Sequence, residues 1–352
     1  MNEKEGEKKA EVRNRGIGLF SDSAVISPLF PIHKTENFME SLITSQRTKA
    51  NPEVIVWPRV TVVSVNYKQP ELTRKMLYSL LETSYPDLEI ILVDNETDGV
   101  SIPAMEKDFP EVRFLYSESN LGFAGGNNIG FHAATGKYIL MLNNDTEVDP
   151  GFLEPMVEMM ELNKEIGIVS PKIFFYDEPD TLQFAGTTLI HPITSRGRKF
   201  GYGEKDTGQH DLPRETGYAN GACMMVRKEA LDRIGGEMYE DYFLYYEEHD
   251  MTERIRQAGY RIMFNPAGKI FHKISAATGK MSPLKAFYLH RNRWVFIKRN
   301  QKGITRWLAQ AYYLLIATPK AWLKYAYQGD NQRRKAIEKA TAQALKGDMS
   351  RW

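Results

Sequence analysis

Short apolar runs alternate with longer amphipathic stretches from residue 60 of the 352-residue chain onward. The runs have the length of buried β-strands and span 60–65, 88–93, 112–116, 137–142 and 166–169. The stretches between them, such as 71–81 and 150–162, are long enough to form crossover helices. This alternation predicts an α/β fold, with a Rossmann-like, mostly parallel sheet and helices on both of its faces.

The pattern becomes less regular beyond residue 171, where Gly and Pro are frequent from 186 to 221. We expect a small, mixed second sheet in this part of the chain. Helices are predicted again at 227–234, 248–257 and 284–298, with a short strand at 261–264. Residues 1–58 show no sustained period, which is typical of an N-terminal extension that is partly disordered.

Composition narrows the class of protein. Hydrophobic residues make up 42% of the chain and charged residues 26%, a balance that excludes a collagen-like or largely disordered protein. Cys223 is the single cysteine, so no internal disulfide can form, and this fits a reducing compartment. The first fifteen residues are dense in Glu and Lys and show no secretory signal. A cytoplasmic location is therefore expected.

The C-terminal tail, residues 283–352, is strongly basic. It carries 15 Lys and Arg against 3 acids, a charge of +12, whereas residues 1–282 carry a charge of −11. Aromatic residues such as Trp307 and Trp322 lie among the cations, a combination that suits an anionic membrane surface better than nucleic acid. The longest uncharged run, 307–319, would rise about 20 Å as a helix, which is too short for a hydrocarbon core of about 30 Å.

We therefore expect a basic amphipathic helix that lies peripherally on the inner face of the cytoplasmic membrane, with a break or kink at Pro319. In the alternative, the helix packs on the body of the protein or on a second subunit, which would make the chain an oligomer. No nucleic-acid partner is expected.

Polar residues follow three of the apolar runs. Asn66 follows the first run, Asp94 the second, and Asn143, Asn144 and Asp145 the fourth. Ligands of open parallel sheets bind outside the carboxyl ends of the strands, so these side chains are expected to share one edge. Asp145 offers a hard carboxylate oxygen for a divalent cation bound to a diphosphate. In the alternative, these are ordinary turn residues, and Asp145 caps the helix that starts near residue 150.

A glycine-rich segment, NLGFAGGNN at 120–128, opens a helix after the third run. Glycines such as Gly122 let a ligand approach the backbone, and free N–H groups at a helix N-terminus bind anions such as a diphosphate. The segment is neither a G-x-G-x-x-G fingerprint nor a Walker loop. A dinucleotide oxidoreductase and a P-loop NTPase are therefore disfavoured.

A second group of acids, Glu247, Glu248 and Asp250, lies at the start of a predicted helix, after two tyrosines. A partly desolvated carboxylate at such a place is suited to take a proton from a hydroxyl group. The helix dipole alone also favours acids there, and Asp250 could pair with the Arg four residues later. His272 is a candidate metal ligand, although a single His is more often structural.

These residues together form a set of motifs in fixed order. The motifs are VSVNY at 63–67, VDN at 93–95, NLGFAGGN at 120–127, LNND at 142–145, GACMMVR at 221–227 and YEEHD at 246–250, followed by His272. In order and spacing the set resembles the family 2 glycosyltransferases, the inverting group with the GT-A fold, and most closely their rhamnosyltransferase-like members. The resemblance covers about residues 60–299.

The resemblance implies a GT-A domain at 59–282, with a nucleotide-sugar-binding half at 59–170 and an acceptor half at 171–282, followed by a C-terminal helical extension at 283–352. The nucleotide-sugar site that it implies comprises Asn66, Asp94, Gly122, Asn127, Asn143, Asn144 and Asp145. Of these, Asn66 and Asp94 would line the pocket for the base and ribose. Asp145 and His272 would bind the divalent metal, Mg or Mn. Glu248 would be the general base, with Glu247 and Asp250 as neighbours that position the acceptor.

The activity implied by the resemblance is a metal-dependent, inverting sugar transfer. The donor would be a UDP- or dTDP-sugar, with rhamnose as the candidate sugar, and the acceptor a hydroxyl of a glycan or lipid-linked molecule in bacterial cell-envelope polysaccharide synthesis. The chain departs from the family pattern at Asn143 and Glu248, where Asp is usual. Two alternatives remain at this point. One is a sugar nucleotidyltransferase, which would need a basic residue near the first strand, where Lys68 is a weak candidate, and the other is a non-catalytic sugar-nucleotide-binding scaffold.

Overall fold

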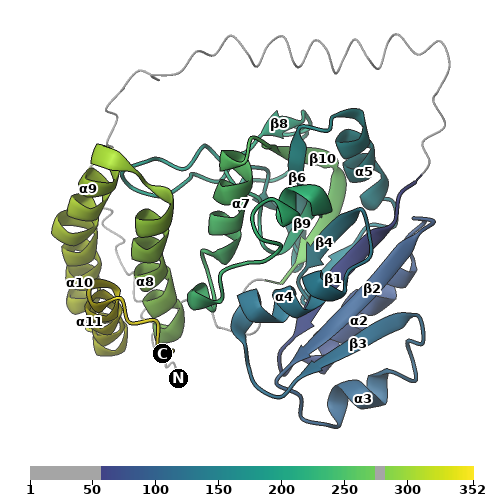
Figure 1. Ribbon diagram of the computed structural model, residues 1–352, viewed down its shortest axis with the longest axis horizontal. Helices are drawn as coiled ribbons and strands as arrows, with labels where there is room; N and C mark the ends of the chain where they lie inside the picture. Colours follow the sequence, from purple (N-terminus) through teal and green to yellow (C-terminus); the bar gives the residue numbers. More distant parts are fainter. Residues whose placement is uncertain (1–56, 274–281) are drawn as a thin grey trace, which may run out of the picture. The chain divides into compact units, whose positions relative to one another are not determined.

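The computed structural model describes residues 57–273 and 282–352 (Figure 1). The predicted N-terminal extension therefore lies, apart from its last two residues, outside the described residues. The strands within these ranges join one ten-stranded sheet. They are β1 (Val60–Asn66), β2 (Leu88–Asn95), β3 (Val112–Ser117), β4 (Tyr138–Leu142), β5 (Thr146–Val148), β6 (Ile166–Phe175), β7 (Glu178–Phe184), β8 (Arg214–Glu215), β9 (Cys223–Arg227) and β10 (Arg261–His272).

The strand order is β3-β2-β1-β4-β9-β6-β10-β5, with β7 paired to β6 and β8 to β10. β3, β2, β1 and β4 are mutually parallel, and β10 is parallel to β6. β9 runs antiparallel between β4 and β6. The predicted α/β fold with a mostly parallel sheet is therefore confirmed.

Helices connect and cover these strands. They are α2 (Pro70–Leu81), α3 (Ser101–Met105), α4 (Gly122–Ala133), α5 (Leu153–Leu162), α6 (Lys228–Asp232), the 3₁₀ turn η1 (Glu240–Tyr242), α7 (Glu247–Gln257), α8 (Pro283–Asn300), α9 (Gly303–Tyr312), the π-helical turn η2 (Tyr313–Ala317), α10 (Thr318–Tyr327) and α11 (Asn331–Lys346). Helices α4, α6 and α7 share one core cluster with residues of the sheet.

The path of the chain through the sheet creates a place for a ligand. The chain moves outward from β1 to β2 and β3, then returns to β4 on the other side of β1. Because parallel crossovers are right-handed, this reversal puts α2 and α4 on opposite faces of the sheet. Ligands of open α/β sheets bind at the carboxyl ends of the strands at such a reversal, which here is the edge after β1 and β4.

One detail of the predicted architecture is wrong in the described part of the chain. The strands expected to form a separate mixed sheet, β7 and β8, instead extend the main sheet through β6 and β10. For β7 the reason is the length of β6, which continues past its predicted end at residue 169 and pairs with β7 over residues 173–175. β8 pairs with β10 at Met263 and Phe264, within the range predicted for that strand.

The C-terminal helices pack on each other and on the loop before α7. Phe287 of α8, Tyr325 of α10 and Ile337 of α11 share a core cluster, against which Phe243 of that loop packs. Helix α8 lies between α7 and the outer helices α9 and α10 (Figure 1).

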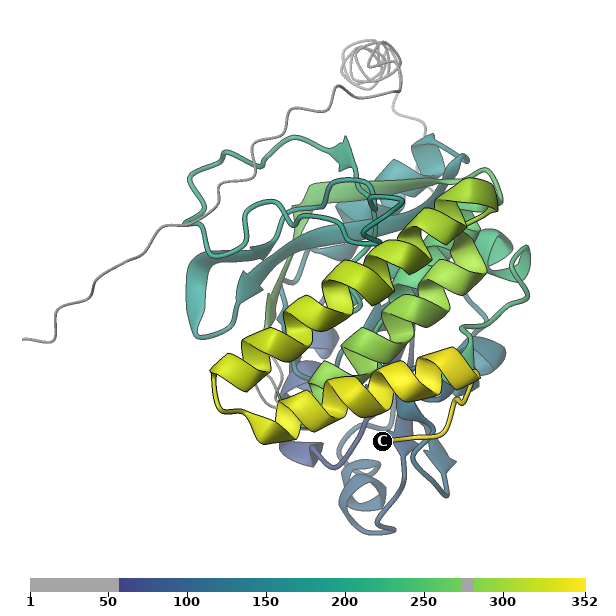
Figure 2. The same ribbon diagram turned by 90° about the vertical axis from the view of Figure 1, so that its left-hand side faces the viewer.

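The predicted helix around 307–319 is part of a helical stretch from α9 through η2 to α10 (Figure 2). It continues through Pro319 because the π-helical turn accommodates the missing N–H. No described helix is both long and apolar enough to cross a bilayer.

Candidate active site

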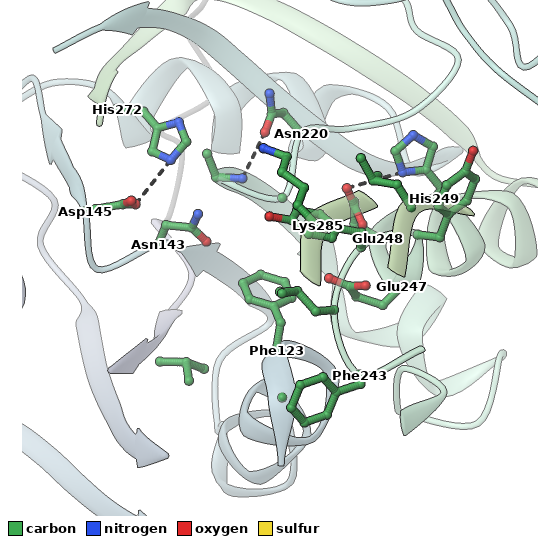
Figure 3. A pocket seen from close by; sticks show the side chains of 18 of the residues that line it. Phe123, Asn143, Asp145, Asn220, Phe243, Glu247, Glu248, His249, His272 and Lys285 are labelled. Atoms are coloured by element: carbon green, nitrogen blue, oxygen red, sulfur yellow. Dashed lines mark hydrogen bonds and ion pairs between the residues drawn. The ribbon is translucent and has the colours of Figure 1, made fainter. Parts of the chain in front are cut away.

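A pocket of about 840 Å³ lies beside the carboxyl ends of β1 and β4 and the start of α7. Asp145 and Glu248, which are far apart in the sequence, both line this pocket. Figure 3 shows Asp145 and His272 on one side of it and Glu247 and Glu248 on the other. The volume is within the range of small-molecule sites, which is about 300–1,000 Å³. We call the two sides the Asp145 side and the Glu248 side.

The register of β10 brings His272 to Asp145. β10 pairs antiparallel with β5, where His272 is the partner of Thr146. The N–H of Lys273 donates to the carbonyl of Asp145 at 3.0 Å. As a result, Nε2 of His272 lies 3.1 Å from Oδ1 of Asp145, and both side chains are largely buried.

Gln183 of β7 fixes the orientation of the His272 ring. Its Nε2 donates to the carbonyl of His272 at 3.2 Å, so its Oε1 is the atom that lies 2.6 Å from the ring Nδ1. An amide oxygen only accepts, so Nδ1 carries a hydrogen and Nε2 is the ring nitrogen that faces Asp145. Two atoms with lone pairs at this distance repel each other unless a proton or a cation lies between them.

The Asp145–His272 pair fits a divalent cation. Adjacent ligands of an octahedral ion, each at about 2.1 Å from it, lie about 3 Å apart, which matches the observed separation. Oδ1 of Asp145 is buried and has no hydrogen-bond partner. The described residues hold no cluster of three or more His, Cys, Asp or Glu side chains suited to a metal. Further ligands would therefore come from the substrate and water, as is usual for Mg.

Three residues predicted for the nucleotide sugar, Gly122, Asn143 and Asn144, line the pocket. Oδ1 of Asn143 is buried without a hydrogen-bond partner. Gly122 has a φ of 74°, and a Cβ there would lie 2.3 Å from the carbonyl oxygen of Phe243. That carbonyl accepts the N–H of Phe123 at 2.7 Å. This glycine therefore permits close contact between α4 and the loop before α7, and the Phe123 N–H is occupied by the protein itself.

Three other predicted residues, Asn66, Asp94 and Asn127, are buried and do not line the pocket. Nδ2 of Asn66 donates to Oδ1 of Asp94 at 2.7 Å and joins the ends of β1 and β2. Nδ2 of Asn127 donates to a carbonyl within α4 at 2.8 Å. The next residues in sequence, Tyr67 and Asn95, line the pocket instead. Neighbouring residues of a strand face opposite ways, which explains the offset of one residue.

Asp250 also lies outside the pocket and is fully buried. Its Oδ1 accepts the hydroxyl of Tyr242 at 2.9 Å and Nδ2 of Asn300 at 2.8 Å. Its Oδ2 pairs with Nε of Arg254 at 2.8 Å. Asp250 therefore ties α7 to α8.

The loop before α7 places Glu247 and Glu248, the first two residues of that helix. Phe243, Tyr245 and Tyr246 all have a positive φ, at 61°, 67° and 76°. Each such backbone conformation costs a non-glycine residue of order 1–3 kcal/mol and persists only where the surroundings hold it. The catalytic candidates are thus built on a strained segment.

Helix α8 supplies the contacts that hold this segment. Nδ2 of the buried Asn292 lies 2.8, 2.9 and 2.7 Å from the carbonyl oxygens of Tyr242, Leu244 and Tyr245. Arg291, also buried, donates to the Tyr242 carbonyl at 3.2 Å. Carbonyl groups that strand pairing would normally satisfy are satisfied here by side chains of the tail.

The two glutamates differ in their electrostatic surroundings. Burial, and then the charge of Glu248, raise the pKa of Glu247 well above its ordinary value. Burial opposes ionisation of Glu248 as well, but the charge and hydrogen bond of His249 and the charge of Lys199 lower its pKa. Nδ1 of His249 lies 3.2 Å from Oε1 of Glu248. The two pKa values are thus shifted in opposite directions, so Glu248 is the glutamate that ionises more readily and Glu247 the one that keeps its proton more readily.

Several lining residues escaped the sequence-based prediction. They include Tyr67, Asn95, Asn120, Gln183, Arg196, Lys199, Tyr218, Asn220, His249 and Lys285. Asn95, Asn120 and His249 lie within the motifs and could have been chosen. His249 stacks on Tyr218 with ring centroids 4.0 Å apart, a contact that no spacing rule reveals. Arg196 and Lys199 lie in the irregular segment after β7, where the sequence has no periodic signal.

Comparison with solved structures identifies the fold. The mannosyltransferase PcManGT of Pyrobaculum calidifontis, in complex with GDP-Man and Mn²⁺, superposes with a TM-score of 0.54 over 88% of this chain and 96% of its own, at 18% identity. The glycosyltransferase GalNAc-T7, solved with UDP, GalNAc and Mn²⁺, superposes with a TM-score of 0.55 over 83% of this chain and 56% of its own, at 14% identity. The fold is that of a GT-A glycosyltransferase.

Sequence comparison identifies the family. Residues 61–235 match the model described as Glycosyl transferase family 2. A Mycobacterium tuberculosis protein named N-acetylglucosaminyl-diphospho-decaprenol L-rhamnosyltransferase is 24% identical over 69% of this chain and 85% of its own length. The O-antigen biosynthesis protein RfbC of Myxococcus xanthus is 26% identical over 62% of this chain and 18% of its own. The chain belongs to family 2 of the glycosyltransferases and is rhamnosyltransferase-like in sequence, as predicted.

Proposed function

We propose that the protein is a metal-dependent, inverting glycosyltransferase that moves a sugar, with rhamnose as the candidate, from a UDP- or dTDP-sugar to a hydroxyl of a lipid-linked or other glycan acceptor. The observation that carries the proposal is that the Asp145–His272 pair and the Glu248 carboxylate face one pocket. The name of the mycobacterial relative, which includes a diphospho-decaprenol acceptor, supports the acceptor class. A role in bacterial cell-envelope polysaccharide synthesis is part of this proposal.

In the proposed reaction, ionised Glu248 takes the proton of the acceptor hydroxyl. The hydroxyl oxygen forms a bond to the anomeric carbon as the bond from that carbon to the diphosphate oxygen breaks on the opposite side, so the configuration inverts. Asp145 and His272 would hold a Mg or Mn ion, which supplies positive charge for the departing nucleoside diphosphate. Glu247, protonated, remains able to donate a hydrogen bond to the acceptor.

We assign residues 59–170 to the donor and 171–282, together with α8, to the acceptor. In this assignment Tyr67 and Asn95 contact the nucleoside. The hydrogen bond between the buried Asn66 and Asp94 holds together the strand ends that carry them. Lys68, the candidate for a nucleotidyltransferase, does not line the pocket, and its Nζ lies 3.3 Å from Glu96. No observation therefore favours that alternative.

Donor binding and product identity test the proposal. A panel of UDP-, dTDP- and GDP-sugars with Mn should include a donor that raises the Tm, because a ligand that binds only the native state stabilises it. Asp145→Asn should abolish this rise. Incubation with that donor and lipid-linked acceptors should release a nucleoside diphosphate. If no donor raises the Tm, or if pyrophosphate is released from a nucleoside triphosphate instead, the assignment is wrong.

We also propose that the helical stretch from α9 through η2 to α10, which we call the outer helix of the tail, lies on an anionic membrane. Its apolar residues Ile304, Trp307, Leu315, Leu323 and Tyr327 are between 61% and 95% exposed. They recur at spacings that keep them on the outward face. On the inward face, Ala309 and Tyr313 are buried in a core cluster with residues of α8 and α11. An amphipathic helix with an exposed apolar face is typical of a segment that lies in the membrane interface.

Charge favours a lipid surface over a second copy of the chain. Arg306, Lys320 and Lys324 lie on the same helical stretch, within a tail that carries a charge of +12. Two such tails would repel each other, whereas anionic lipid headgroups attract each basic residue by about 1 kcal/mol near the surface.

Vesicle sedimentation of the full chain tests this part. Deletion of the tail is unsuitable because α8 forms part of the core, so the variant is the double substitution Trp307→Ser and Leu315→Ser. It should bind phosphatidylglycerol vesicles about tenfold more weakly, since two large apolar side chains no longer enter the interface. Leu212→Ser, at an equally exposed leucine outside the tail, is the control and should bind normally. Unchanged binding, or a loss of dimers instead of vesicle binding, would contradict the proposal.

A further inference from the structure

Three basic side chains line the pocket together with Glu248: Arg196, Lys199 and Lys285. Arg196 and Lys199 come from the irregular segment after β7, and Lys285 comes from the first turn of α8. In Figure 3, Lys285 lies near Glu248 and Asn220, and Asp145 and His272 lie across the pocket. Lys285 is therefore separate from the side to which the donor diphosphate is assigned, and Lys199 lies close enough to Glu248 for its charge to lower the pKa of that glutamate.

Basic side chains outnumber the two glutamates among the described residues that line the Glu248 side. Within the described ranges, Arg196 and Lys199 form no ion pair with a carboxylate. Of the two carboxyl groups here, burial and the charge of Glu248 raise the pKa of Glu247, which disfavours its charged form.

A hydrogen bond from helix α8 of the tail holds the segment that carries Arg196. Nη2 of Arg293, a buried residue of α8, donates to the carbonyl of Thr194 at 2.5 Å. The backbone N–H of Lys285 donates to the side chain of Ser282, the N-cap of α8, at 3.2 Å. Both parts of the basic group are thus positioned by hydrogen bonds of α8.

Apolar side chains continue the pocket beyond the cations. Leu284 and Leu289 of α8 line it on either side of Lys285 in the sequence, and Tyr245 lines it from the strained loop. A ligand on this side therefore meets positive charge next to an apolar surface. That combination fits an amphiphile with an anionic head.

We propose that Arg196, Lys199 and Lys285 bind the phosphate or diphosphate group of a lipid-linked acceptor, with the first part of its hydrocarbon chain on Leu284 and Leu289. The inference rests on the proposed function for the identity of the reaction, and it deepens it by naming the acceptor class and its site. Arg and Lys form strong, charge-assisted hydrogen bonds with phosphate oxygens. A phosphate or diphosphate group offers several anionic oxygens to these three basic side chains, whereas a carboxylate offers two.

Binding of farnesyl diphosphate to the full chain, measured by calorimetry in EDTA, tests this site. EDTA removes the divalent cation on which the donor side depends. We expect farnesyl diphosphate to bind at least tenfold more tightly than farnesol, and also more tightly than inorganic pyrophosphate. The double substitution Lys199→Gln and Lys285→Gln should remove most of the preference over farnesol, because each lost phosphate contact weakens binding by about tenfold. Asp145→Asn is the matched control and should retain the preference.

The outcomes separate this inference from the proposed function, because the measurement needs no sugar transfer. Equal affinity for farnesol and farnesyl diphosphate would overturn the phosphate site. Equal affinity for pyrophosphate and farnesyl diphosphate would overturn the role of the apolar wall. A preference that disappears in Asp145→Asn but survives in the lysine variant would place the phosphate on the donor side and overturn the proposal. Arg196→Gln provides a second variant and should reduce the preference by about tenfold as well.

Discussion

The two sides of the pocket are built by different means. On the Asp145 side, His272 and Asp145 meet because β10 and β5 pair in a fixed register, so the geometry is a property of the sheet. On the Glu248 side, the carboxylate follows a strained loop whose carbonyls are held by Asn292 of α8. The Asp145 side is therefore stabilised by backbone pairing, and the loop that carries Glu248 is stabilised by side chains from the C-terminal helices. The tail thus completes the Glu248 side.

The largest effect is expected at the base itself. Glu248→Gln keeps the size of the side chain but removes its ability to accept a proton, so kcat for transfer should fall by about 10²- to 10⁴-fold. The donor-induced rise in Tm should remain, since the Asp145 side is untouched. Asp145→Asn, in contrast, should lose the donor-induced rise in Tm. Near-normal turnover of Glu248→Gln would place the base elsewhere.

The pKa of Glu248 gives this prediction a pH dependence. Because the folded protein lowers that pKa below the ordinary value of 4.5, the base stays ionised as the pH falls to that value. The acidic limb of kcat/KM should therefore lie below pH 4.5 wherever the fold persists. Substitution of Lys199 by Gln removes one of the charges that lower the pKa, and it should move this limb upward.

A smaller but still large effect is expected at Asn292, which we regard as a positioning residue. Asn292→Ala removes the amide that bonds the carbonyls of the strained loop, so Glu248 loses its fixed position. A misplacement of about 1 Å can cost about 10²-fold, and we expect a loss of that order in kcat with little change in the KM for the donor. Thr341→Ala, which removes a hydrogen bond within α11, is the matched control in the tail. Equal losses in both variants would indicate general destabilisation.

Substitution of Gln183, the hydrogen-bond partner of His272, tests the Asp145 side of the pocket. Gln183→Ala leaves Nδ1 of His272 without its acceptor and frees the ring to turn. Loss of such a partner typically weakens metal binding by about 10- to 100-fold, and Mn titration by calorimetry should show a change at the lower end of that range. Gln183→Glu keeps an acceptor at the same place and should bind Mn at least as well as the natural chain. An unchanged Mn affinity in Gln183→Ala would mean that His272 is not a ligand.

The same contrast explains which parts of the molecule were predictable. The strands and Asp145 follow from apolar runs and the polar residues at their ends, because regular pairing makes position in the sequence a guide to position in space. The same rule selects Asn66 and Asp94 as pocket residues, yet each lies one residue away from the position that lines the pocket. The pattern of apolar runs shows where a strand ends but not on which face of the sheet a given side chain lies. Arg196 and Asn292 had no local signal: their roles arise from contacts with distant segments. The resemblance to family 2 supplied Glu248, which charge and spacing alone had left among alternatives.

The smallest expected effect concerns stability and Glu247. Its folded pKa lies well above the ordinary 4.5, first because it is buried and then because Glu248 is negative. The folded state therefore favours the protonated form, and this contribution to stability is complete below pH 4.5 and is lost as the pH rises through the folded pKa. Glu247→Gln is neutral at every pH and avoids that loss. Its Tm should equal that of the natural chain near pH 4 and exceed it by on the order of 2 °C at pH 8 and above, where each kcal/mol corresponds to about that shift. A lower Tm at pH 8 would mean that Glu247 is ionised and paired in the folded protein, and the division of the two glutamates into a proton holder and a base would be wrong.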